Sequence, residues 1–210
     1  REEDLDQVRE NGKVAREPPV APKSFTSGLA KGVESETIKF TNPDDEGVVA
    51  TIYRNAFTAE LEVAIELEYS RLDWGDAQVI TLCKALRAAH QLGGLTNLLT
   101  LDLSHNRIGD KAMEVLVPLL KSGQFGALPK LQGLILYNNQ ISDKGVATLA
   151  TALRDGAMPS CTEYGFRGQL PCPYGFLYNN PGSDAPVKEA LRARGVALSS
   201  ESDPDSSDSD

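Results

Sequence analysis

The sequence predicts an α/β fold: a short curved solenoid of strand–helix units, with a parallel β-sheet on the concave face and α-helices on the convex face. The first observation is a repeat, because LDLSHNRIGD at 101–110 returns as LILYNNQISD at 134–143 and, with changes, as FLYNNPGSD at 176–184. The second is that helical periodicity follows each of the first two copies. One strand–helix unit cannot bury its own apolar face, so successive units are expected to stack.

Each unit contains a strand signal followed by a helix signal. The residues LDL at 101–103 alternate between apolar and polar, which is the period of a short strand. Apolar residues recur at helical spacing in the stretches 110–123 and 143–156. Each stretch opens with an Asp, which we expect to be the helix N-cap, and ends at a Gly. Pro118 lies inside the first stretch and is expected to bend or shorten that helix.

The pattern LxxLxLxxNxI followed by a helix resembles the leucine-rich repeat family, and specifically its long, ribonuclease-inhibitor type. The residues that carry the resemblance are LTNLLTLDLSHNRIGDKAMEVLVPLL and LPKLQGLILYNNQISDKGVATLATAL. The resemblance implies a right-handed solenoid in which the consensus Asn satisfies backbone groups of the bend after each strand. In this chain those residues would be Asn106, Asn139 and Asn180.

The other segments frame a repeat region of about four units that we place at 61–198. Residues 1–40 contain few apolar side chains, so we expect an extended, disordered leader. Residues 41–60 are expected to form a helix that begins with an Asn cap and a Pro and covers the N-terminal end of the core. The tail at 199–210 is acidic and too polar to bury, and we expect it to be disordered.

An insertion near 157–173 separates the last two repeats and leaves two alternatives open. The inserted loop could leave the inner face of the sheet exposed or fold back and cover it. Cys161 and Cys172 could form a disulfide, but two thiols are favoured, because three cysteines in a repeat protein are typical of a reducing compartment. We therefore expect an intracellular, cytoplasmic protein, while the removal of an organelle-targeting leader stays open.

Composition and motifs argue against several classes of function. The net charge of −9 argues against nucleic-acid binding, which requires a basic surface. No stretch is long and apolar enough to predict a membrane span. The histidines and cysteines lack metal-site spacing, and the phosphate-loop, dinucleotide and zinc-protease motifs are missing. The sequence therefore predicts no metal, no cofactor and no catalytic residue.

The inner face of the sheet is the candidate partner-binding surface. The strand positions that point away from the predicted core are acidic in the N-terminal half and aromatic in the C-terminal half. Neighbouring exposed Ile, Phe and Tyr side chains are typical of an anchor pocket. The candidate contact residues are Glu66, Glu68, Asp102, Ser104, His105, Ile135, Tyr137, Asn138, Phe176 and Tyr178.

These observations favour a non-enzymatic protein-interaction module whose partner carries basic contact residues at one end and apolar ones at the other. Two alternatives come from resemblance. Some long-repeat members of the family are activators of Ran-type small GTPases, which makes GTPase regulation one alternative. The combination of a repeat domain and an acidic tail is similar to the acidic leucine-rich nuclear phosphoproteins, which hold histones and other basic partners.

Overall fold

The structure is a computed structural model that describes residues 16–198 except 43, 122–125, 162, 165, 168–169 and 172–176. Its elements are α2 (Pro22–Glu34), α3 (Asp45–Val63), β1 (Glu66–Glu68), α4 (Asp76–Gln91), β2 (Thr100–Asp102), α5 (Asp110–Leu116), the 3₁₀ helix η1 (Val117–Leu120), β3 (Gly133–Ile135), α6 (Asp143–Arg154), β4 (Glu163–Tyr164), β5 (Phe166–Arg167), β6 (Leu170–Pro171), α7 (Ala185–Arg192) and β7 (Ala197–Leu198).

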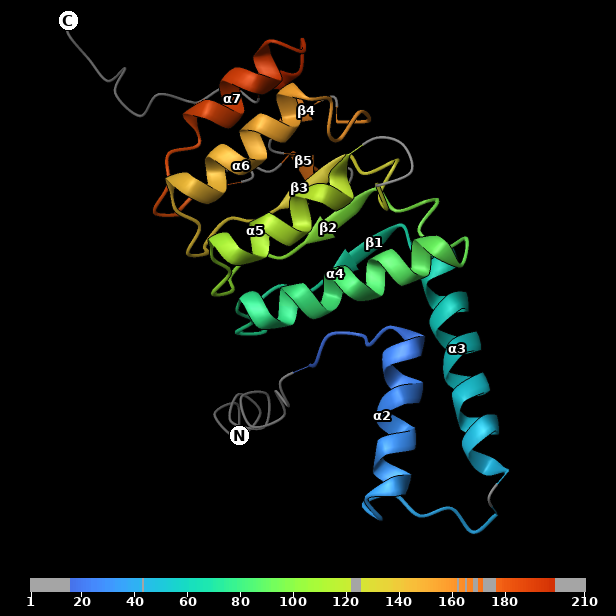
Figure 1. The fold of residues 1–210 in the computed structure, drawn as a ribbon. Coiled ribbons are helices and arrows are strands. Elements are labelled where there is room, and N and C mark those ends of the chain that lie inside the picture. Colours follow the sequence, from blue (N-terminus) through green and yellow to red (C-terminus); the bar gives the residue numbers. More distant parts are fainter. Residues whose placement is uncertain are drawn as a thin grey trace, which may run out of the picture.

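The expected α/β architecture is confirmed. Strands β1, β2 and β3 form a parallel sheet in that order, and α4, α5, α6 and α7 stack one after another along the repeats (Figure 1). Glu68 pairs in register with Asp102, and Asp102 pairs with Ile135. Residues one repeat apart in the sequence are therefore neighbours in space.

The core lies between the sheet and the helices. Leu101 and Leu134 point into it from neighbouring strands and have no exposed surface. Cys83 of α4 packs among these apolar side chains, as its position in the repeat predicts, and burial raises the pKa of its thiol to about 12. The predicted effect of Pro118 is also confirmed, because α5 ends at Leu116 and the chain continues as η1.

The consensus Asn residues form the ladder that the resemblance implies. Asn139 donates to the carbonyl oxygens of Leu103 at 2.9 Å and Leu136 at 3.0 Å, and accepts from the N–H of Ile108 at 3.0 Å. Asn106 and Asn180 make equivalent bonds in their own repeats. Each amide thus joins the bend of its own repeat to the bend of the repeat before it.

The expectation that each helix-opening Asp is the N-cap of its own helix is wrong for α4, α5 and α6. The N-cap residues there are Gly75, Gly109 and Ser142, and the Asp is the first helical residue. The carboxylate of Asp76 instead accepts from the N–H of Gly109 at 2.7 Å, at the start of the next helix. At α7, Asp184 occupies the N-cap position, but its side chain makes no cap hydrogen bond to that helix. A cap supplied by the preceding repeat makes neighbouring units depend on each other.

The N-terminal part differs from the expected extended leader, because α2 lies within 1–40 and packs beside α3 (Figure 1). The ring of Phe25 stacks on that of Tyr53 at 3.8 Å, and the Tyr53 hydroxyl donates to the carbonyl of Val20 at 2.7 Å. Helix α3 covers the first repeat only with its C-terminal half, where Phe57 and Leu61 are buried.

The described part of the insertion contains three short strands, β4, β5 and β6. β4 pairs with β7, β5 pairs with β6, and β5 lies against β3. Cys161 is buried, but Cys172 is outside the described residues, so the choice between two thiols and a disulfide lies outside them too. The strand expected for the fourth repeat also falls largely outside them. That repeat joins the stack through the N–H of Asn138, which donates to the carbonyl of Tyr178 at 2.9 Å.

Candidate functional site

The structure places the candidate strand residues side by side but does not expose all of them. Glu66 and Glu68 are exposed on β1. Asp102 is 0% exposed, Ser104 1% and Ile135 1%, so the expectation that these three form an open contact surface is wrong. Phe176 lies outside the described residues.

Local structure explains part of this burial. The Oδ1 atom of Asp102 accepts from the N–H of Ser104 at 2.8 Å, so the carboxylate is used in the turn that follows β2. Because β5 lies against β3, the inserted segment runs beside Ile135. Of the two alternatives for the insertion, the contact with β3 favours the loop that folds back.

The next residues along each repeat remain accessible and form a row. Arg71, His105, Asn138 and Asn179 each precede the ladder position of their repeat, and we call them the turn row. Their φ angles are +58°, +52°, +54° and +52°, so all four lie in the left-handed region. Asn tolerates this conformation best among residues with a side chain, because its short amide can bond locally. The turn after each strand thus presents one polar side chain per repeat.

Side chains of the turn row contact one another across four repeats. A guanidinium nitrogen of Arg71 lies 3.5 Å from Nε2 of His105, and the amide nitrogen of Asn138 lies 3.3 Å from both ring nitrogens of His105. The amide of Asn179 donates to Oδ1 of Asn138. The Tyr137 ring meets the His105 ring edge-on, with centroids 5.1 Å apart. The row is therefore continuous, with an aromatic ring packed beside its centre.

Electrostatics make the centre of the row neutral. Burial lowers the pKa of His105, the Arg71 guanidinium lowers it further, and the Asp102 carboxylate opposes both effects. An imidazole with a lowered pKa is uncharged at neutral pH. The row offers one cation at Arg71, then an imidazole and two amides, with Tyr178, 53% exposed, nearby.

Sequence reasoning selected His105, Tyr137, Asn138 and Tyr178 but missed two members of the row. Arg71 and Asn179 occupy the position directly before the ladder residue, as His105 and Asn138 do. That alignment was the available signal.

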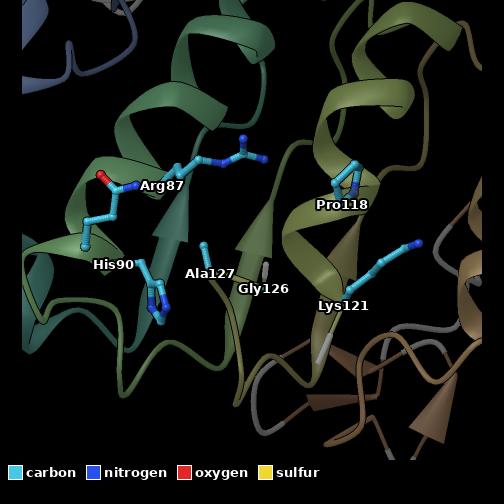
Figure 2. Close-up of a pocket in the computed structure, with 7 residues that line it drawn as sticks. Arg87, His90, Pro118, Lys121, Gly126 and Ala127 are labelled. Atoms are coloured by element: carbon cyan, nitrogen blue, oxygen red, sulfur yellow. The ribbon is translucent and has the colours of Figure 1, made fainter. Parts of the chain in front are cut away.

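A hollow on the helical side lies between the C-terminal ends of α4 and η1 and has a volume of about 490 Å³ (Figure 2). Arg87 and His90 line it from α4, and Lys121 lines it directly after η1. None of the described residues that line it is a buried polar side chain, so nothing there would hold a ligand in one orientation. We assign it no function.

Two further features of the described residues bear on function. Among them, no group of three or more His, Cys, Asp or Glu side chains is arranged to hold a metal ion. The helices within the same part of the chain are all too short or too polar to cross a membrane.

Residues 94–117 and 127–150 match the protein-family model described as Leucine Rich repeat. The chain therefore carries leucine-rich repeats of the ribonuclease-inhibitor-like type at 94–150, which confirms the resemblance inferred from the repeated motif. Leucine-rich repeat domains are generally protein-interaction modules and typically non-catalytic. A search of curated proteins finds no match to the chain.

Proposed function

We propose that this chain is a non-enzymatic adaptor that binds a protein partner through the turn row and the two tyrosines beside it. The observation that carries the proposal is the continuity of the row from Arg71 to Asn179, with one accessible side chain from each repeat. Amides and an imidazole can donate and accept hydrogen bonds, while Tyr137 and Tyr178 supply amphipathic area at low entropic cost.

We still expect a partner with basic contact residues at one end and apolar contact residues at the other, but fewer residues of this chain carry that pattern. Glu66 and Glu68 lie at the N-terminal end of the sheet and favour basic contact residues there. Tyr178, at the other end, favours an apolar or aromatic contact. Asp102, Ser104 and Ile135 are buried, so we do not propose them as contact residues.

The test is quantitative affinity purification followed by mass spectrometry, with the wild-type chain beside Tyr137→Ala/Tyr178→Ala. The matched control is Lys84→Ala/Lys111→Ala, which changes two exposed residues on the helical side. We expect the tyrosine variant to lose the main partner at least about tenfold, because central aromatic contacts each contribute about 2 kcal/mol. If the two variants recovered equal amounts of the partner, the turn row would not be part of the interface.

The two alternatives need other tests. A GTP-turnover assay of a Ran-type GTPase with and without the chain would detect an activator, and we expect no acceleration. The histone-binding alternative depends on the acidic tail at 199–210, which is outside the described residues. Deletion of that tail with partner binding intact at moderate salt would count against it.

A further inference from the structure

The first strand of the sheet, β1, has a described neighbouring strand on one edge only. Among the described strands, β1 pairs with β2 and with no other. The carbonyl of Ile65 and the N–H of Tyr69 face β2, since they bond to the N–H of Leu99 and the carbonyl of Asp102, both at 2.8 Å. Successive residues of a strand bond towards opposite edges. The backbone groups of Glu66 and Glu68 therefore face away from the sheet.

A groove runs beside this edge. Its volume is about 490 Å³, and its walls come from α3, β1 and the segment that precedes α2. Phe57, Val63 and Leu67 supply much of its apolar lining. Val63 is 71% exposed, and the nearby Ile65 is 60% exposed. Apolar surface of this kind, next to a strand edge that no other described strand covers, is typical of a site that receives another chain.

The charged residues at the groove are mainly acidic. Glu60 and Glu66 line it, Glu68 is two residues further along β1, and Arg16 is the basic residue among the lining side chains. Arg16 illustrates how a basic side chain is held here. Its guanidinium donates to the carbonyl of Glu68 at 3.4 Å and lies 5.0 Å from the centre of the Tyr69 ring.

We propose that the edge of β1 and this groove bind an extended segment of a partner protein in which aliphatic residues alternate with lysine or arginine. Backbone hydrogen bonds to Glu66 would add the segment as a further strand, since main-chain pairing supplies affinity in this mode. Alternate side chains of a strand point to opposite faces, so aliphatic residues would enter the groove while basic residues meet Glu60 and Glu66.

Charge argues against two other occupants of this groove, the terminal segments of this chain and a second copy of it. Residues 1–15 of this chain carry five acidic and three basic side chains, and the tail at 199–210 has acidic residues and no basic ones. A second copy that paired edge to edge would bring Glu66 and Glu68 of both copies together, and like charges on paired strands are destabilising. A basic segment from another protein has neither problem.

The test uses the full chain and a labelled six-residue peptide, Lys-Val-Lys-Leu-Lys-Val, with Glu-Val-Glu-Leu-Glu-Val as its charge-reversed control. Fluorescence anisotropy is expected to show at least about tenfold tighter binding of the lysine peptide, with the difference falling as salt rises. Amide NMR shifts should concentrate in 65–69. A peptide N-methylated at alternate residues should lose binding, because it cannot pair with the strand.

Variants sharpen the test. Glu60→Lys should weaken the lysine peptide about fivefold, while Glu62→Lys, the same change outside the groove lining, should leave it unchanged. Tyr137→Ala/Tyr178→Ala should also bind the peptide normally, which separates this surface from the turn row. Failure of the lysine peptide to bind, equal binding of the two peptides, or equal effects of the Glu60 and Glu62 changes would overturn the proposal. So would concentration-dependent dimerisation through 65–69, which would assign the edge to a second copy.

Discussion

The carboxylate of Asp110 and the residue Ser142 are joined by two hydrogen bonds across a repeat boundary. Oδ1 accepts from the Ser142 N–H at 2.9 Å, and Oδ2 accepts from the Ser142 hydroxyl at 2.6 Å. Oδ1 also accepts from the N–H of Gly145 at 3.0 Å. Two of the first N–H groups of α6 are thus satisfied by the helix before it, and the negative charge lies at the positive end of the α6 dipole.

Asp110→Ala is therefore expected to destabilise the fold by about 1–3 kcal/mol, since it removes a charged cap and leaves two N–H groups without their partner. Urea unfolding followed by circular dichroism measures this. The control is Asp155→Ala, an exposed position at the other end of α6, which should change stability by less than about 0.5 kcal/mol. Equal effects of the two changes would contradict the shared cap.

Gly145 packs closely against the Asp110 carboxylate. A Cβ atom there would lie 2.5 Å from Oδ1 of Asp110 and 2.7 Å from Cγ2 of Ile141. Gly145→Ala should therefore destabilise the protein, although Ala usually stabilises a helix by about 1 kcal/mol relative to Gly. In α2, a Cβ atom at Gly28 would meet nothing within 4 Å, so Gly28→Ala should show the usual gain. Thermal melts of both variants give the comparison, and a gain at Gly145 would contradict it.

The repeat periodicity was enough to predict the sheet and its register. Leu101 and Leu134 occupy the same position in two copies of one motif. When such copies stack, these two residues become partners on neighbouring strands. The cap that Asp110 supplies could not be predicted in this way. Rules for helix ends consider the helix that the residue begins, whereas the bonds of Asp110 go to the following helix.

The alignment of the repeats also could not predict that inner-face strand residues such as Ile135 are buried. The insertion has no counterpart in the other repeats, so no periodicity predicts that β5 lies against β3 near Ile135. Helix α2 was missed because its sequence, with two glycines and several Ser and Thr residues, has weak helix propensity. Its packing on α3, through Phe25 and Tyr53, outweighs that propensity.

The ladder residue Asn139 is expected to be among the most sensitive polar positions. It is buried and bonds to three carbonyl oxygens and one N–H of the surrounding bends. Asn139→Ala would leave the N–H of Ile108 without this partner, while the carbonyls of Leu103 and Leu136 would each keep a bond from a neighbouring ladder amide. We therefore expect a loss of about 1–3 kcal/mol. Asn55→Ala, at an exposed site on α3, is the control for loss of an amide. Chemical denaturation of both variants measures the difference, and similar stabilities would contradict a structural role for the ladder.

His105 should make stability depend on pH. Its folded pKa lies below the unfolded value of about 6.5, chiefly through burial and then through Arg71. Its contribution to stability is therefore fully present above the unfolded pKa and is lost as pH falls through the folded pKa, because the unfolded state binds the proton more readily. Asp110, whose pKa is lowered by the bonds from Ser142 and Gly145 in spite of the opposing effect of burial, contributes a similar loss only in more acidic solution.

Replacement of His105 by Asn separates the charge of the side chain from its conformation. Asn already occupies the same left-handed position at 138 and 179, so His105→Asn should fold normally and lose the pH dependence below about pH 6.5. His105→Val should lose the same pH dependence but also about 1–2 kcal/mol at all pH values, since a β-branched residue is strained at a φ of +52°. Urea midpoints at about pH 5 and about pH 8 measure both effects. If His105→Asn kept the wild-type slope, the pH dependence would have to arise from a group other than the imidazole at the centre of the turn row.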